Sequence, residues 1–388
     1  MKVLLINDFI ECGGAELQTK REMSNFISHN DEVLLITFDK KNKIIENNIN
    51  IKINYTFFSK VYNKLFSNPI IKFKLKRIIK KFGPDYIHIN NIFACPITVY
   101  KAVKNYKTVQ TIRDYGAVCS KTTCIYDDYT ECAGYCNSNC KNCLKNKGFK
   151  TKFKKKSFDR INKFKFKSID KFICPSEALT MKCKENNHDI VCINNPFDFS
   201  KITVKEKKLI GKKIFLYYGM IEEIKGIYIL IDAFKKFYVN KDDVELHIIG
   251  KVVPKEKELF EKSIENDGQI KYFGYMKNDL ILNKLKEVFC VVVPSLWIEN
   301  YPNTVLEPMA NKTIVIGSNR GGIKGMINNE DLLFDIKDSN DLLNKLEYVY
   351  SLDTDTYMKF VEDNFKKIET NNTIDVYYER LTNLLKSL

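Results

Sequence analysis

The chain has 388 residues, of which 44% are hydrophobic and 29% charged, and its formal net charge is +15. This length allows two hydrophobic cores of ordinary size, and the apolar content, with 21 Tyr and 26 Phe, excludes an intrinsically disordered chain. No run approaches the ~18–20 apolar residues that a helix needs to cross a bilayer, so the sequence predicts no membrane-spanning helix.

The beginning of the chain and its cysteines indicate the compartment. The first apolar run, over residues 2–6, is too short for the core of a signal peptide and is soon followed by Asp8. Several of the 12 Cys, such as Cys95 and Cys174, are single and scattered, unlike a secreted disulfide framework. We therefore expect a cytoplasmic protein.

The positive charge is concentrated in the first half. Residues 1–200 contain 35 Lys and Arg against 19 Asp and Glu, a net charge of +16, whereas residues 201–388 contain 28 against 29. Two basic segments, 72–81 and 145–171, dominate. The second places Phe and Ile among its lysines at close to helical spacing. This pattern fits a helix that buries its Phe side chains, or one that adsorbs to an anionic membrane.

In chain order, short apolar runs alternate with helical patterns, which predicts an α/β fold of two doubly wound parallel sheets. The strands expected in the first half cover residues 3–7, 33–37, 86–89, 108–112, 171–174 and 190–193. Those expected in the second half cover residues 214–218, 245–249, 270–273, 290–293 and 314–317. Helices are expected to follow Gly14, Pro96, Ser176, Gly226, Asp279 and Pro302, with two more over residues 356–368 and 373–388. Residues 201–213 are charged and poorly periodic, which is typical of a linker.

Two motifs of the first half could carry chemistry. Gly13 and Gly14 follow the first strand, where glycine lets a ligand approach the backbone closely. Arg113 and Asp114 follow the strand that begins at residue 108. Arg113 stays protonated and cannot act as a general base, but it can bind a phosphate or an acidic acceptor. The alternative for Arg113 is an ion pair with Asp114.

Six cysteines come within 25 positions, directly after that strand: Cys119, Cys124, Cys132, Cys136, Cys140 and Cys143. Only Cys140 and Cys143 have the two-residue spacing that is typical of zinc ligands. One interpretation is a structural zinc ion held by this pair and two of the other four thiols. Ordinary thiols and redox chemistry are the alternatives.

In the second half, polar residues follow two of the expected strands. Tyr218 and Gly219 end one strand, and Lys225 comes just before a helix, where it could neutralise negative charge. Glu299 lies in a loop after another strand. Pro302 suits the first turn of a helix, and Glu307 lies about one and a half turns further in.

This combination suits a nucleotide sugar. Glu299 offers an acceptor for sugar hydroxyls, the helix N-terminus offers a positive dipole for a diphosphate, and Glu307 offers a bidentate acceptor for a ribose diol. Taken alone, the two glutamates would more often be solvated residues of a strand–loop–helix, and the surrounding residues reverse that interpretation.

Together these motifs resemble the GT-B nucleotide-sugar glycosyltransferases, specifically the retaining family 4 (glycosyl transferases group 1). Residues 291–323 follow that family's donor-site motif, and the glycine pair follows its N-terminal turn. Residues 218–226 are similar to its diphosphate-binding loop, and residues 193–198 to its interdomain junction. The resemblance implies two Rossmann-like domains facing across a cleft. Residues 1–199 would bind the acceptor and residues 200–388 the nucleotide sugar, with the last helix, about 373–388, packing back on the first domain.

The resemblance also implies an activity and a set of site residues. The chain would transfer a hexosyl group from a nucleoside diphosphate sugar, with retention, to a glycan or lipid-linked saccharide in surface polysaccharide synthesis. The expected catalytic residues are Glu299 for the donor sugar, Lys225 for the diphosphate, and Arg113. A retaining mechanism of this kind needs no His base and no cofactor, because the departing phosphate oxygen can take the acceptor's proton. Donor binding is expected from Gly13, Gly14, Gly219, Asn300, Tyr301, Pro302, Asn303, Thr304 and Glu307.

Two positions depart from the family pattern, and two alternative functions stay open. Met220 stands where the family usually has Arg, and Arg113 where it often has His. A sugar-nucleotide epimerase of the same fold would need no acceptor, and a zinc-bearing nucleic-acid-binding protein would leave the donor motif unexplained. We therefore expect a nucleotide sugar, a glycan or lipid-linked acceptor and an anionic membrane as partners, and no nucleic acid. The expected location is peripheral, at the inner face of the plasma membrane.

Overall fold

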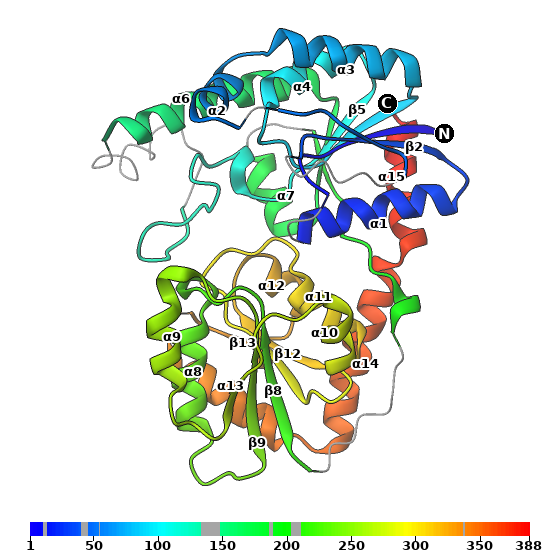
Figure 1. The fold of residues 1–388 in the computed structure, drawn as a ribbon. Coiled ribbons are helices and arrows are strands. Elements are labelled where there is room, and N and C mark those ends of the chain that lie inside the picture. Colours follow the sequence, from blue (N-terminus) through cyan, green and yellow to red (C-terminus); the bar gives the residue numbers. More distant parts are fainter. Residues whose placement is uncertain are drawn as a thin grey trace. The chain divides into compact units, whose positions relative to one another are not determined.

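The computed structural model describes residues 1–10, 14–39, 46–53, 55–132, 148–185, 189–202, 211–336 and 338–388. These residues form two compact units, the first comprising Met1–Pro196 with Ile374–Leu388 and the second Phe197–Thr373 (Figure 1). Each unit contains one parallel sheet with helices packed on it. The predicted fold class, two doubly wound parallel sheets, is therefore confirmed.

The first unit is built on a seven-stranded sheet with the order β3-β2-β1-β4-β5-β6-β7. The strands are β1 (Lys2–Ile6), β2 (Glu32–Thr37), β3 (Asn48–Asn50), β4 (Tyr86–Ile89), β5 (Thr108–Thr111), β6 (Lys171–Cys174) and β7 (Ile190–Cys192). The central strands are almost wholly buried, which explains why they read as continuous apolar runs. The edge strand β3 has the polar sequence Asn-Ile-Asn, and the hydrophobic pattern did not predict it.

Seven helices of the described residues pack on this sheet. They are α1 (Gly14–Ser28), α2 (Phe57–Leu65), α3 (Pro69–Phe82), α4 (Pro96–Val103), α6 (Gly148–Ser168), α7 (Glu177–Lys184) and α15 (Ile374–Lys386). Helices α2, α3, α4 and α6 lie together, and α15 lies beside α1 on the other face (Figure 1). Tyr377, Leu381 and Leu385 of α15 join a core that also contains Leu5 and Phe26. The last helix therefore packs on the first unit.

The second unit is built on a six-stranded sheet with the order β10-β9-β8-β11-β12-β13. The strands are β8 (Lys213–Tyr218), β9 (Val244–Ile249), β10 (Ile270–Tyr272), β11 (Cys290–Val293), β12 (Ile314–Ser318) and β13 (Leu333–Phe334). The α-helices of this unit are α8 (Ile227–Phe237), α9 (Lys257–Ile264), α10 (Asn278–Lys284), α11 (Asn303–Ala310), α12 (Gly321–Ile327), α13 (Ser339–Ser351) and α14 (Thr354–Asn372). In its core the Phe215 ring has edge contacts with Phe234, Phe237 and Phe289, at centroid distances of 5.2 to 5.8 Å.

Both sheets reverse their winding direction at one point. In the first, β1 lies between β2 and β4, and in the second, β8 lies between β9 and β11. Crossovers leave these positions in opposite directions, which opens a crevice at the carboxyl ends of the two neighbouring strands. Residues just after β1 and β4, and just after β8 and β11, are therefore placed to meet ligands.

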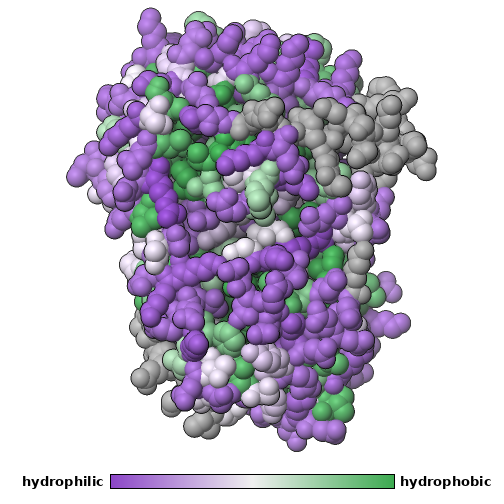
Figure 2. Space-filling model, turned by 180° about the vertical axis from the view of Figure 1, so that it is seen from behind, coloured by the Kyte–Doolittle hydropathy of each residue, from purple (hydrophilic) through white to green (hydrophobic). Residues whose placement is uncertain are grey.

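Hydropathy can be compared across one face of the protein. On the face seen from behind, hydrophilic residues predominate and hydrophobic residues occur in small groups between them (Figure 2). Among the described residues, no helix is both long and apolar enough to pass through a bilayer.

Candidate functional site

Lys225 and Glu299 form an ion pair after β8 and β11, the strands at which the second sheet reverses its winding. Lys225 ends a short 3-10 helix after β8, and Glu299 lies in the loop after β11. The Lys225 Nζ and Glu299 Oε1 atoms are 2.6 Å apart, and the side chains are 30% and 20% exposed. Ser295 donates to the same Glu299 oxygen at 3.3 Å, and the ammonium group lies 5.4 Å from the centroid of the Trp297 ring. The pair is thus held in place and still accessible to a ligand.

Glu307 lies in the same unit as the centre of a buried hydrogen-bonded group. It is only 1% exposed, although it is a carboxylate. Tyr218 donates to its Oε2 atom at 3.2 Å, and Asn278 donates to its Oε1 atom at 3.0 Å. Burial and the neighbouring Glu307 hold the pKa of Tyr218 well above its usual range, so the phenol keeps the proton that it donates. Each Glu307 oxygen has a second lone pair with which it can accept a further hydrogen bond.

At two glycines of the second unit, neighbouring loops approach so closely that a side chain would not fit. Gly226 has a φ of 74°, and a Cβ there would lie 1.7 Å from the Pro294 carbonyl oxygen. A Cβ on Gly322, the second residue of α12, would lie 1.5 Å from the carbonyl oxygen of Asn300. Gly322 also donates its N–H to the Glu299 carbonyl at 2.7 Å. The loop that carries Glu299 therefore rests directly on the start of α12, where only glycine fits.

The helix α11 supplies an N-terminus beside this loop. Pro302 occupies its N-cap position, just before the first turn in which the sequence placed it, and no side chain caps the helix. Asn303 and Thr304 form the first turn, and Tyr301 donates its hydroxyl to Asn372 at 3.0 Å. This turn is the positive end of the helix, which favours a nearby anionic group.

Gly219 and Met220 begin the loop after β8. Gly219 has a φ of 150°, and its carbonyl oxygen would lie 1.7 Å from a Cβ on Gly250, so the turns after β8 and β9 touch through glycine. Met220 is 46% exposed. Its side chain adds no charge to this edge, so Lys225 is the cation that the loop contributes there.

Arg113 belongs to the first unit, at the end of β5. Its guanidinium donates to Asn90 Oδ1 at 2.6 Å and 3.2 Å and to Asn195 Oδ1 at 3.1 Å. Asp114, its expected partner in the simpler interpretation, instead accepts a hydrogen bond from the Gly116 N–H at 2.7 Å. The guanidinium is thus oriented by two amide side chains, one on each side of it.

A buried network that the sequence did not reveal lies behind Arg113. Asn90 also donates to Glu22 at 3.3 Å, and the Glu22 carboxylate lies against Nδ1 of the fully buried His88. The His88 Nε2 atom is 2.8 Å from the Thr111 hydroxyl. The four histidines appeared scattered in the sequence, and only the pairing of β4 with β5 brings this one to Thr111.

Of the two glycines expected to approach the donor, Gly14 is the first residue of α1 and is exposed, and Gly13 lies outside the described residues. Asp8, two residues after β1, was not predicted as a site residue. It is completely buried, and its Oδ2 atom accepts hydrogen bonds from the N–H groups of Phe93 and Ala94. Burial raises the pKa of Asp8 to about 7. Only the strand order in the structure places Asp8 at the winding reversal of the sheet, so the sequence carried no signal for it.

Three of the six clustered cysteines can be placed. Cys119, Cys124 and Cys132 are buried, and Cys132 donates its N–H to the Cys124 carbonyl at 2.8 Å. No group of three His, Cys, Asp or Glu residues that could hold a metal ion occurs within the described ranges. Cys136, Cys140 and Cys143 lie outside the described residues, so the structural zinc site stays a prediction.

Two family models match the chain, one for each unit. The model for glycosyltransferase family 4 matches residues 12–201, and the model for glycosyl transferases group 1 matches residues 198–367. The second match contains Lys225, Glu299 and Glu307. No sequence among the curated proteins matches the chain.

Solved structures with similar folds cover the whole chain. Sucrose-phosphate synthase from Thermosynechococcus elongatus has a TM-score of 0.75 at 15% identity, over 100% of this chain and 98% of its own. Anabaena HepE in complex with UDP has a TM-score of 0.75 at 14% identity, over 100% of both chains. A glycosyltransferase from Rickettsia africae has a TM-score of 0.72 at 19% identity, over 100% of this chain and 98% of its own. At these identities the likeness establishes the fold, which is GT-B.

Proposed function

Since this chain is a glycosyltransferase of the GT-B fold with a glycosyl transferases group 1 domain, we propose that it transfers a hexosyl group from a nucleoside diphosphate sugar, with retention, to a glycan or lipid-linked saccharide. The observation that carries this proposal is the ion pair of Lys225, after β8, with Glu299, after β11, in the same unit that holds the buried Glu307. The similar fold of Anabaena HepE, which was solved with UDP and with UDP-glucose, supports a nucleotide-sugar donor.

The chemistry follows from where charge develops. Breaking the glycosidic bond leaves negative charge on the diphosphate, and groups aimed at that charge lower the barrier. Lys225 can turn from Glu299 to the diphosphate, because its ammonium group is on a flexible chain and remains 30% exposed. The first turn of α11 adds N–H groups and a positive dipole end.

The two glutamates take different parts of the donor. Glu307 is fixed by Tyr218 and Asn278, so it suits a group that is held in the same way throughout the reaction, such as the ribose diol. Glu299 becomes free to accept hydrogen bonds from the hexosyl hydroxyls once Lys225 engages the diphosphate. Ion-pair exchange of this kind would couple diphosphate binding to capture of the sugar.

Retention fits a reaction on one face of the sugar, in which the departing phosphate oxygen accepts the proton of the acceptor hydroxyl. Arg113 stays protonated and is a donor, so its proposed part is to bind an anionic group from the first unit. The two asparagines that hold its guanidinium limit the orientations in which it can do so.

A donor panel tests this proposal. We expect calorimetry with UDP-, GDP-, dTDP- and ADP-sugars to identify one nucleotide class, with a KM in the later transfer assay between about 1 µM and 1 mM. NMR of the glycoside formed should show the anomeric configuration of the donor. Inversion at that carbon would contradict retention, and an isomerised sugar nucleotide formed without acceptor would indicate an epimerase instead.

We also propose that the first unit associates with anionic membranes, through a surface formed by α2 and α3. Large apolar side chains are exposed there: Phe57 (75%), Phe58 (83%), Ile70 (67%) and Phe73 (69%). Helix α3 also contains six Lys and Arg between residues 72 and 81. In the second basic segment, α6, the described Phe side chains are half-buried and the lysines around them largely exposed. Apolar insertion with nearby basic residues is the combination that holds a helix at a lipid surface.

Phe57→Ser/Phe58→Ser is expected to lower binding to vesicles containing phosphatidylglycerol, because it removes the two most exposed apolar side chains of this surface. Sedimentation at two salt concentrations should measure this, since exposed charges are screened over about 8 Å at physiological salt. Leu259→Ser, which removes a side chain that is 56% exposed in the second unit, is the matched control. Equal sedimentation of both variants and the unmodified protein would exclude this membrane surface.

A further inference from the structure

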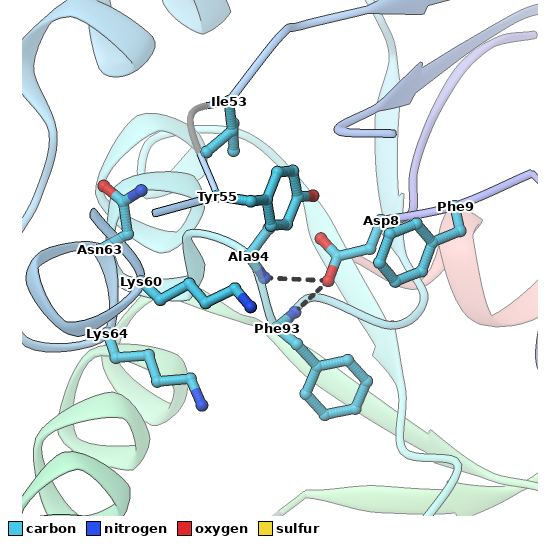
Figure 3. Close-up of a pocket in the computed structure, with 9 residues that line it drawn as sticks. All are labelled: Asp8, Phe9, Ile53, Tyr55, Lys60, Asn63, Lys64, Phe93 and Ala94. Atoms are coloured by element: carbon cyan, nitrogen blue, oxygen red, sulfur yellow. Dashed lines mark hydrogen bonds between the residues drawn. The ribbon is translucent and has the colours of Figure 1, made fainter. Parts of the chain in front are cut away.

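A cavity of about 440 Å³ opens in the first unit at the winding reversal of its sheet. It lies where β1 and β4 end, between the residues after these strands and the helix α2 (Figure 3). Asp8, Tyr55, Lys60, Lys64 and Phe93 are among the residues that line it. Its volume lies within the roughly 300–1,000 Å³ that is usual for small-molecule sites.

Asp8 presents an unsatisfied acceptor to this cavity. Both of its backbone hydrogen bonds, from Phe93 and Ala94, end on the Oδ2 atom. The Oδ1 atom is buried and has no hydrogen-bond partner, and Figure 3 shows it turned away from the two amides, toward the Tyr55 ring. When Asp8 is ionised, this buried acceptor lacks a donor, at a cost in free energy that a ligand hydroxyl would recover. Tyr55 cannot supply that donor, because its hydroxyl donates to the Phe38 carbonyl.

Two lysines face the same cavity from the other side. Lys60 and Lys64 are one turn apart on α2, and Figure 3 shows both ammonium groups pointing inward. Neither forms an ion pair within the part of the chain that the structure describes, and both side chains are exposed. Two adjacent cations without a counter-ion favour a ligand with negative charge. The cavity thus has a buried hydroxyl acceptor at one end and a cationic entrance at the other.

Aromatic rings cover the remaining wall. Tyr55 is half-buried, and Phe93 is 52% exposed beside the two N–H groups that hold Asp8. Exposed aromatic faces next to hydrogen-bonding groups suit a ring that has one apolar face and polar edges.

We propose that this cavity binds the acceptor and that the acceptor is an acidic saccharide, with a hydroxyl on Asp8 and a phosphate or carboxylate on Lys60 and Lys64. This inference rests on the proposed transfer to a saccharide and names the class of acceptor. A phosphate on a lipid-linked sugar and the acidic group of a soluble sugar offer the same chemistry to the lysines. The size and polarity of the cavity match a single sugar ring with its acidic substituent.

Binding of small probes tests the inference directly. The full-length protein, saturated with the nucleoside diphosphate identified in the donor panel, is titrated with glucose 1-phosphate, glucuronic acid and glucose, and saturation-transfer NMR measures binding. We expect the two acidic probes to bind at least about 10-fold more tightly than glucose, because each ion-assisted hydrogen bond contributes more than a neutral one. Equal binding of all three probes would overturn the inference.

Three variants connect this preference to the cavity. Lys60→Gln/Lys64→Gln should reduce binding of the acidic probes to the level of glucose, whereas Lys72→Gln/Lys76→Gln on the neighbouring α3 should leave it unchanged. Asp8→Asn should weaken all three probes about 10-fold, because it replaces the Oδ1 acceptor by a donor. It keeps an oxygen for both backbone hydrogen bonds, so the fold is preserved. Acidic probes that bind the Lys60→Gln/Lys64→Gln variant normally would overturn the assignment.

One comparison identifies the source of the anion, and another separates a failure of the acceptor inference from a failure of the proposed function. Tighter binding of a short-chain polyprenyl diphosphate sugar than of glucose 1-phosphate would identify a lipid-linked acceptor, and the reverse a soluble one. Both results support an acidic saccharide. If no nucleotide sugar binds in the donor panel, the proposed function fails. If the donor binds normally in every variant and the acidic preference is absent, only the acceptor inference fails.

Discussion

Replacing Glu299 with Gln is expected to lower the transfer rate about 100-fold or more, while the nucleoside diphosphate binds at least as tightly as before. The 2.6 Å ion pair between Lys225 and Glu299 must open for the ammonium group to reach a diphosphate. Without the carboxylate charge, Lys225 is released and the negative charge next to the phosphate site disappears. The sugar, however, loses an ionised acceptor for its hydroxyls, and this loss acts on the reacting half of the donor.

Calorimetry with the nucleoside diphosphate and initial rates at saturating donor measure the two effects. Glu287→Gln is a matched control, because Glu287 forms an exposed ion pair with Lys284 in the same unit at 3.2 Å. It should change neither quantity. Weaker diphosphate binding in Glu299→Gln with an unchanged transfer rate would reverse the roles that we assign to the loop.

The buried strands could be predicted from the sequence because apolar residues fill them. The strands β4, β6 and β11 have the bounds that the pattern predicted, β1 is shifted by one residue, and the other predicted strands differ by one residue at one end. The two strands that were missed lie at sheet edges. The edge strand β3 is polar, and β13 has only two residues, so neither shows a hydrophobic run. Their pairing is decided by the neighbouring strand, which a local pattern does not contain.

In the candidate site, too, some residues could be predicted from the sequence and others could not. Glu299, Glu307 and Lys225 could be proposed because each stands at a fixed distance from a strand or helix boundary. Asn278, which donates to Glu307 from 29 positions away, could not, since only the fold of the second unit brings the start of α10 to Glu307. Asp8 was passed over because a single aspartate after a strand carries no motif. Its significance appears only once β4 supplies the two amides that hold it.

The contacts of the glycines are another feature that could not be predicted from the sequence. The Gly321-Gly322 pair is part of the motif that resembles a known family, but the sequence does not say what the glycines touch. The structure shows that Gly322 approaches Asn300, on the loop that carries Glu299. The two ends of the donor motif are therefore in contact in space. The glycines at its end support the loop at its beginning, which carries Glu299.

Gly322→Ala is accordingly expected to impair both stability and transfer. The new Cβ would lie 1.5 Å from the Asn300 carbonyl oxygen, which is backbone and cannot rotate away, so the loop must shift. Overpacking of this kind typically lowers the free energy of unfolding by about 1–3 kcal/mol. Displacement of Glu299 by about 1 Å should lower the transfer rate about 100-fold.

Gly325→Ala is the control on the same helix, because a Cβ at Gly325 has no atom within 4 Å. It should raise the free energy of unfolding by about 0.4–1 kcal/mol, since alanine has fewer conformations to lose on folding. Denaturant unfolding and initial rates measure both variants. If Gly322→Ala matched Gly325→Ala in both, the contact between α12 and the Glu299 loop would not position the carboxylate.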